Sequence, residues 1–127
     1  LRSSPTVLVD AAHNPHGVEA LAGAIEEAFG FQHLVAVLGV MADKDAEGIL
    51  AALEPVTDAV VCVPIDSPRA MEVYGADRVV VSRQLGEGVE QAVALSEGYD
   101  TPLTASGILI LGSVVLAAEA RALFGRP

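Results

Sequence analysis

The sequence predicts an α/β fold, a Rossmann-like three-layer αβα sandwich with a mainly parallel sheet of five to six strands. Short runs of Val, Ile and Leu alternate with Ala-rich stretches of helical periodicity along the 127 residues. Strands that alternate with helices form βαβ units with right-handed crossovers, and such units build a parallel sheet. The chain has three Phe, two Tyr and no Trp. Its core must therefore come from Val, Leu, Ile and Ala, as in a sheet covered on both faces.

The expected elements follow one another without a linker, a repeat or a low-complexity segment. Strands are expected over 6–12, 33–40, 58–64, 77–82 and 106–113. Helices are expected over 15–30, around 49–53, over 86–98, where Gly88 weakens the pattern, and over 114–125.

Helical spacing is clearest in the first helix, where apolar residues recur at i, i+3, i+4 and i+7. These residues are Val18, Leu21, Ala22, Ile25, Ala28 and Phe29. Asn14 suits the N-cap, Pro15 the first helical position and Gly30 the stop. The second helix carries its own apolar residues, Ile49, Leu50 and Leu53, and should end before Pro55.

The formal net charge is −10, from 17 acidic and 7 basic residues. A surface of this sign repels a phosphate backbone, so no nucleic-acid partner is expected. A local anion site is compatible with the charge, because a helix N-terminus and one or two basic side chains can act against the global field.

No apolar run approaches the roughly 20 residues of a membrane span, and the start LRSSPT lacks a signal-peptide hydrophobic region. We expect a cytoplasmic monomer without a membrane partner. The strand close to the start and the absence of an initial Met favour a single domain, residues 1–127, of a longer protein. The one cysteine, Cys62, lies in an apolar strand, which favours a small core residue over a nucleophile.

Four polar clusters each follow the end of an expected strand: 10–14, 39–45, 66–69 and 112–113. In an open α/β sheet, ligands bind outside the carboxyl ends of the strands. The four clusters belong at that one edge, and together they indicate a binding site better than any single motif.

In the first cluster, Asp10, His13 and Asn14 stand between a strand and a helix. A carboxylate there can accept ribose hydroxyls or help to hold a metal ion. His and Asn beside a helix N-terminus can meet phosphate oxygens. The alternative is that Asn14 only caps the helix and Asp10 is solvated.

The other clusters each offer a group that binds anions. Lys44, between two acids, could bind a carboxylate or phosphate as a compact cation, and Arg69, in a turn, suits bidentate carboxylate recognition. Ser113, after a glycine, could cap the last helix while its N–H binds an anion. Each residue also has a plainer alternative. Lys44 could lie in a charged loop in which Asp45 caps a helix, and Asp66 could only close an Asx-turn beside Arg69. Ser113 could only cap the last helix.

Several other sites are not expected. The three histidines lack metal-ligand spacing, which argues against zinc, and His16 and His33 look unremarkable. There is no credible Ser-His-Asp ordering, and no Walker A sequence G-x-x-x-x-G-K-[ST] occurs.

The motifs DAAHNP, GVMADKD, DSPRAM and ILGSVVLAAEARALF occur in this order and cover nearly the whole chain. With them, the sequence resembles the C-terminal domain of folylpolyglutamate synthase, often bifunctional with dihydrofolate synthase, in the Mur ligase superfamily. The resemblance implies an ATP-dependent ligase that phosphorylates a carboxylate of dihydropteroate or a folate. The amine of L-glutamate then attacks the acyl phosphate to give an amide.

The resemblance implies ATP and Mg²⁺ as cofactors. The P-loop, most magnesium ligands and the folate contacts would lie on a central domain outside this chain. Within the chain, Asp10 would contact the ribose or polyphosphate of ATP, and His13 would lie near the phosphates or the incoming glutamate. Asn14 would shape the turn at this nucleotide side.

On the substrate side, the resemblance places Lys44 toward the glutamate or the acyl phosphate. Arg69 and Ser113 would bind a carboxylate of the amino acid. Asp10 and His13, with Lys44, are the catalytic candidates that follow, and no residue of this chain is assigned as a metal ligand.

The chain departs from its relatives in two places. Only three residues lie between Met71 and Gly75, where a longer segment with a helix is expected, which bears on the fold near Arg69. The stretch VVLAAE stands where relatives often have an aromatic residue, so packing there is expected to differ.

Two other functions stay open. The chain could belong to another Mur-type ligase with a different amino acid or acyl acceptor, although DAAHNP favours the folate branch. It could also be a free-standing nucleotide-binding α/β regulatory domain, which predicts measurable ATP or AMP affinity. The ligase hypothesis predicts weak or undetectable binding and no turnover by these 127 residues alone, since they lack a P-loop.

Overall fold

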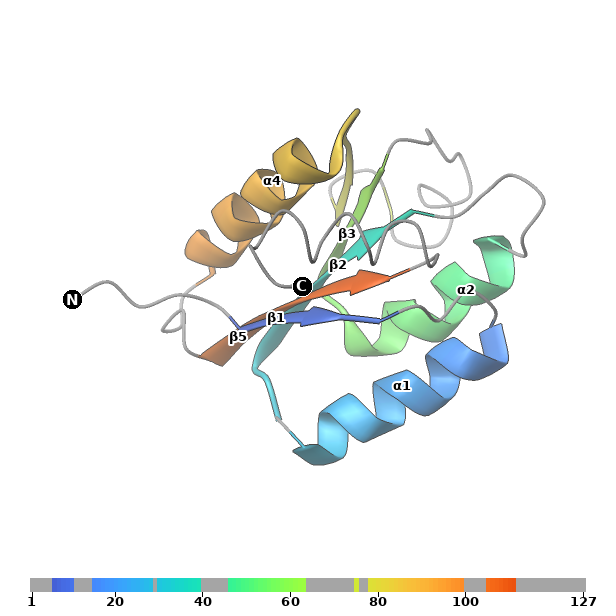
Figure 1. Cartoon of the computed structure of the whole chain (residues 1–127). Coiled ribbons are helices and arrows are strands. Elements are labelled where there is room, and N and C mark those ends of the chain that lie inside the picture. Colours follow the sequence, from blue (N-terminus) through green and yellow to red (C-terminus); the bar gives the residue numbers. More distant parts are fainter. Residues whose placement is uncertain are drawn as a thin grey trace, which may run out of the picture.

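The computed structural model describes residues 6–10, 15–28, 30–39, 46–63, 75, 78–99 and 105–111. Within them, five parallel strands form one sheet, with helices on both faces (Figure 1). The strands are β1 (Thr6–Val9), β2 (His33–Leu38), β3 (Ala59–Cys62), β4 (Val79–Val81) and β5 (Ser106–Leu111). The helices are α1 (Pro15–Ala28), α2 (Ala46–Leu53), the short 3₁₀ helix η1 (Glu54–Val56) and α4 (Leu85–Glu97). The predicted α/β sandwich with a parallel sheet is confirmed.

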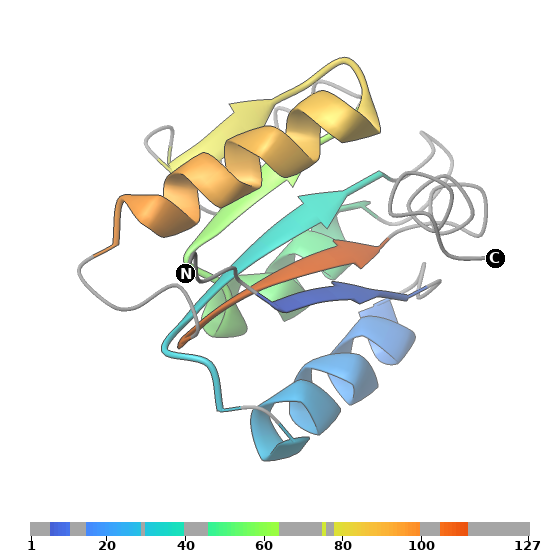
Figure 2. The ribbon, with the colours of Figure 1, turned by 60° about the vertical axis from the view of Figure 1, so that its left-hand side comes forward.

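The strand order is β1-β5-β2-β3-β4, so the last described strand lies between the first two. The connection from β1 to β2 therefore passes over β5. Helices α1 and α2 pack against each other on one face of the sheet, and α4 covers β2, β3 and β5 from the other face (Figures 1 and 2). This arrangement gives the three layers that the alternation of strands and helices predicts.

Helix α1 presents most of the predicted apolar face to the sheet. Val18, Ala22 and Ile25 are buried, and Leu21 is half-buried. The prediction that Ala28 continues this face is wrong, because Ala28 is exposed in the last turn of the helix. A methyl side chain is small enough to lie in water at little cost.

The ends of α1 follow the local signals. The helix begins at Pro15, as predicted, because proline has a fixed φ and lacks an N–H that the first turn would not use. Beyond the helix, Gly30 has a φ of +59°, in the left-handed region that glycine adopts without strain. The predicted N-cap, Asn14, and the apolar residue Phe29 lie outside the described residues.

Helix α2 ends at Leu53, as Pro55 predicts, and the chain continues through η1. Proline cannot donate the backbone hydrogen bond that a longer α-helix would need. The hydroxyl of Thr57 donates to the carbonyl oxygen of Leu53 at 2.8 Å and so satisfies one acceptor at the helix end.

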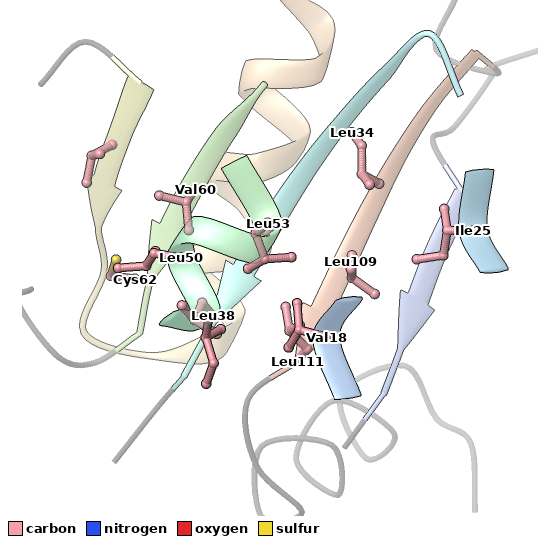
Figure 3. Packing of buried hydrophobic residues seen from close by; sticks show 13 residues of the cluster. Val18, Ile25, Leu34, Leu38, Leu50, Leu53, Val60, Cys62, Leu109 and Leu111 are labelled. Carbon is pink, nitrogen blue, oxygen red and sulfur yellow. The ribbon is translucent and has the colours of Figure 1, made fainter. Parts of the chain in front are cut away.

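The sheet carries a hydrophobic cluster on each face. Figure 3 shows the first, in which side chains of α1 and α2 pack against the sheet. Its largest fully buried side chains are those of Ile49, Leu50, Leu53, Leu109, Leu111, Val18 and Val60. Cys62 belongs to this cluster and is 4% exposed, which confirms it as a core residue.

The second cluster lies between the sheet and α4, and its strand residues alternate with those of the first. It contains Val35, Val37, Ala59, Val61, Val63, Leu85, Val89, Ala92, Ile108 and Ile110. Both faces of the central strands are thus buried, which is why their sequences are continuously apolar.

None of the helices in the described part of the chain is long and apolar enough to cross a membrane. The helix predicted over 114–125 lies outside the described residues.

Candidate functional site

All five described strands point the same way, so their carboxyl ends meet at one edge of the sheet (Figure 2). We call this the carboxyl edge and define it by the residues that follow the strands. These residues are Asp10 after β1, Gly39 after β2, Val63 after β3 and Ser82 after β4, together with Leu111 at the end of β5.

The backbone ladder continues past the strands on both sides of β5. The N–H of Asp10 donates to the carbonyl oxygen of Ile110 at 2.9 Å, and the N–H of Gly39 donates to that of Leu111 at 3.0 Å. Asp10 and Gly39 therefore flank the point from which the chain continues to Ser113. Three of the four polar clusters begin on adjacent strands here.

The remaining cluster, 66–69, follows β3 in the sequence, and β3 is the next strand beyond β2. The N–H of Val63 donates to the carbonyl oxygen of Leu38 at 2.9 Å, and the N–H of Ser82 donates to that of Cys62 at 2.9 Å. Neighbouring strands lie about 4.8 Å apart, so the carboxyl ends of β1, β5, β2 and β3 lie within about 15 Å of one another. The described strand ends share one edge, and the gathering of the polar clusters at that edge stays a prediction.

The strand order makes the middle of this edge a favourable place for a ligand. The last described strand lies between β1 and β2, whereas the helices that follow β1 and β2 both lie on one face. The helix after β4 lies on the other face. A reversal of strand order of this kind is where open α/β sheets form their binding crevice.

Of the predicted site residues, the structure describes Asp10. Asp10 is half-buried directly after β1, beside the end of β5. The other five predicted residues lie outside the described residues: His13, Asn14, Lys44, Arg69 and Ser113. Their roles, and that of Asp10, stay predictions.

In the described part of the chain, no group of three or more His, Cys, Asp or Glu could hold a metal ion. Asp10 offers one carboxylate at the carboxyl edge, and a hard cation such as Mg²⁺ needs about six oxygen ligands.

A polar cluster that the sequence did not predict lies at the opposite, amino edge of the sheet. The ring of His33 stacks on that of Tyr99 with centroids 4.2 Å apart, and its Nδ1 lies 3.4 Å from Oδ1 of Asp58. Among the described residues, Nδ1 has no hydrogen bond, since this contact has the distance of an ion pair without hydrogen-bond geometry. The other oxygen of Asp58 accepts the N–H of Leu34 at 2.9 Å.

This amino-edge cluster shifts the acidity of one group. Burial raises the pKa of the Tyr99 hydroxyl, the negative charge of Asp58 adds to the rise, and Arg78 opposes it. The sequence did contain a signal, because His33, Asp58 and Arg78 each stand next to the start of an apolar run. Polar residues before strands gather at the amino edge for the same reason that those after strands gather at the carboxyl edge.

Comparison with protein families identifies a matching family. The family described as "Mur ligase, glutamate ligase domain" matches residues 1–113, which is most of the chain.

Individual relatives agree with the family match. The dihydrofolate synthase/folylpolyglutamate synthase of Mycobacterium tuberculosis is 44% identical over 99% of this chain. The solved folylpolyglutamate synthase of that organism, complexed with ADP and AMPPCP, superposes with a TM-score of 0.86 at 46% identity over 99% of this chain. A bifunctional folylpolyglutamate synthase/dihydrofolate synthase from Yersinia pestis, complexed with AMPPNP and a Mn ion, has a TM-score of 0.75 at 25% identity over 97% of this chain.

These relatives are much longer than this chain, which spans 29% of the curated relative and 31% and 30% of the two solved chains. The alignment with the curated relative extends over 143 residues, against 127 in this chain, so at least 16 residues of the relative have no counterpart here. This agrees with the expectation that a connection is shortened. The expected place, between Met71 and Gly75, lies among residues outside those described, and it stays a prediction.

Proposed function

This chain belongs to the family of Mur ligase glutamate ligase domains, and we propose that it is the C-terminal domain of an ATP-dependent folate ligase. The reaction is the addition of L-glutamate to dihydropteroate or to folates. The observation that carries the proposal is the geometry of the carboxyl edge. Asp10 and Gly39 flank the end of β5, so three polar motifs of the chain start side by side.

The proposed reaction has two steps. A carboxylate oxygen of the pterin substrate attacks the γ-phosphorus of ATP, and ADP leaves. The neutral amine of L-glutamate then attacks the carbonyl carbon of the acyl phosphate. The C–N bond forms, inorganic phosphate leaves, and the amine gives up a proton.

This chain contributes binding and orientation to those steps. Asp10, His13 and Asn14 form the nucleotide side, where a carboxylate can accept ribose hydroxyls and a helix N-terminus can meet phosphate. Lys44 and Arg69 hold the carboxylates of glutamate and leave its amine free to react. Fixing the amine beside the acyl phosphate replaces a bimolecular encounter by a near-unimolecular step.

On the substrate side, Ser113 completes the carboxylate contacts next to the end of β5. The proposed catalytic residues are Asp10, His13 and Lys44. Of these, Lys44 is the cation that would stabilise the negative charge developing on the phosphate. A bound divalent cation would neutralise charge on the phosphates. Most of its ligands would come from other parts of the enzyme.

The relatives' greater length supports a second part of the proposal. Residues 1–127 form one domain, and a P-loop domain upstream in the longer protein supplies the remaining wall of the site. The whole enzyme is proposed to act as a cytoplasmic monomer.

Substrate profiling of the full-length enzyme tests the proposal against the other ligase branch. We expect ADP formation with dihydropteroate or a folate to require L-glutamate, and L-alanine or diaminopimelate to give no more than the background rate. Turnover that depends on alanine or diaminopimelate would assign the enzyme to the peptidoglycan branch. Turnover with none of the three amino acids would overturn the proposal.

A further inference from the structure

Gly88 is the fourth residue of α4, in the first turn of the helix, and glycine in a helix is less favourable than alanine by up to about 1 kcal/mol. It is buried against the sheet, and a Cβ added there would lie 2.7 Å from Cγ2 of Val63 and 3.5 Å from Cγ1 of Val61. Glycine therefore lets the helix axis approach the end of β3 more closely than any other residue would allow.

Val63 cannot easily move away from an added methyl group. Its side chain is 2% exposed, and a β-branched side chain has few staggered positions to choose from. Its N–H donates to the carbonyl oxygen of Leu38, which ties it to the end of β2. Val63 is also the residue at which the chain leaves β3 at the carboxyl edge.

The same helix holds the end of the next strand. The hydroxyl of Ser82 donates to Oε1 of Gln91 at 2.9 Å, and Nε2 of Gln91 donates to Oε1 of Glu87 at 3.5 Å. The added Cβ at Gly88 would also lie 3.6 Å from Cβ of Ser82. The first turns of α4 thus fix the positions of the carboxyl ends of β3 and β4.

We propose that Gly88 is a positioning residue for the carboxyl edge: by admitting α4 onto Val63, it sets where the end of β3 stands beside the glutamate side of the site. The inference rests on the proposed function, which takes this edge as a wall of the ligase site. The alternative is that Gly88 serves core packing alone.

The two accounts differ in what the substitution Gly88→Ala does to the full-length enzyme. If Gly88 positions the edge, glutamate contacts are weakened in the ground state and the transition state alike. The KM for L-glutamate should then rise about fivefold, with little change in kcat per folded enzyme. If Gly88 serves core packing alone, Gly88→Ala leaves less of the enzyme folded. The maximal rate then falls while the KM for L-glutamate is unchanged.

ATP supplies an internal comparison. Asp10, on the proposed nucleotide side, lies three strands from β3, a separation of about 14 Å. The KM for ATP should therefore stay within about twofold of the wild-type value in Gly88→Ala, since packing effects fade over such a distance.

Val63→Ala provides the rescue, because it removes the Cγ2 atom that the new methyl group would meet. The double variant Gly88→Ala/Val63→Ala should have a glutamate KM nearer to wild type than Gly88→Ala alone. Gly23→Ala is the matched control, since it makes the same change in α1 where an added Cβ has nothing within 4 Å. It should leave both KM values unchanged.

The outcomes separate this inference from the proposed function. A rise in the glutamate KM that the double variant reverses supports the inference. An unchanged glutamate KM in Gly88→Ala, or a raised KM that Val63→Ala does not lower, overturns it while the proposed function stands. Wild-type enzyme without glutamate-dependent ADP formation overturns both.

Discussion

Gly107, the second residue of β5, lies against the ring of Phe31. A Cβ added to Gly107 would come within 2.7 to 2.8 Å of three ring carbons. We expect Gly107→Ala to lower the free energy of unfolding by about 1–3 kcal/mol, because the half-buried ring of Phe31 must shift to accept the methyl group. Urea unfolding of the chain measures this change.

Gly23→Ala is the control for Gly107→Ala, because the added methyl group at residue 23 meets no atom within 4 Å. It should leave stability unchanged or raise it by up to about 1 kcal/mol, as alanine favours a helix over glycine. Equal losses for the two variants would contradict the close contact with Phe31.

Tyr99 makes stability depend on pH in the alkaline range. Its pKa is raised above the ordinary value of 10.0, chiefly by burial and also by the charge of Asp58. The unfolded chain therefore ionises this hydroxyl first as the pH rises. The stabilising contribution of Tyr99 is complete below the unfolded pKa and is lost as the pH rises through the folded one.

Comparison with Tyr99→Phe isolates this effect, because phenylalanine keeps the ring that stacks on His33 and cannot ionise. The urea midpoint of the wild-type chain should fall more steeply than that of the variant above about pH 10. Parallel pH profiles for the two chains would show that the environment of Tyr99 does not shift its pKa.

At the scale of elements, Arg78 links the start of β4 to η1 and to the start of β3. Its Nε donates to the carbonyl oxygen of Asp58 at 2.8 Å, and its Nη2 donates to that of Thr57 at 3.1 Å. Its Nη1 lies 3.2 Å from Oε2 of Glu54, a pair in which both side chains are about one-third exposed. The two part-buried bonds to backbone carbonyl groups matter more than this partly solvated ion pair.

Arg78→Lys should therefore lower the free energy of unfolding by about 1–2 kcal/mol, because an ammonium group cannot reproduce the fork of three donors. Arg83→Lys, at an exposed position, is the matched control and should have no measurable effect. Because the main bonds go to carbonyl groups, the difference between the variants should persist in high salt. Its disappearance there would assign the effect to the ion pair with Glu54.

The elements themselves could largely be predicted from the sequence. The apolar spacing of Ile49, Leu50 and Leu53 and the position of Pro55 located α2 and its end, because these signals act within a few residues. The exposure of Ala28 was not predicted, since periodicity does not tell where a helix face stops touching the sheet. The insertion of β5 between β1 and β2 depends on long-range pairing that no local pattern encodes.

For the whole molecule, the sequence predicted a common edge for the polar clusters because parallel strands must end together. It did not predict which clusters are neighbours. The bonds of Asp10 and Gly39 to the end of β5 depend on the strand order, and they bring residues distant in sequence side by side. The amino-edge cluster of His33, Asp58 and Tyr99 was not predicted, because its three residues lie far apart in sequence and form no motif.

The isolated chain provides a test at this scale between a ligase domain and a regulatory domain. We expect the 127 residues to show weak or undetectable heat of ATP or AMP binding in calorimetry, since the proposed site takes its P-loop wall from another domain. Binding in the low micromolar range, about −8 kcal/mol, would favour a free-standing nucleotide-binding domain.

The central claim is that the carboxyl edge of this domain forms part of the site for ATP and L-glutamate. The most direct measurement is glutamate-dependent ADP formation by the full-length enzyme, comparing wild type with Asp10→Asn and with Glu26→Gln, an exposed residue of α1. We predict that Asp10→Asn lowers kcat/KM for ATP by about tenfold or more, as loss of a charged hydrogen-bond acceptor implies, while Glu26→Gln matches wild type. Wild-type activity in folded Asp10→Asn enzyme would contradict the claim.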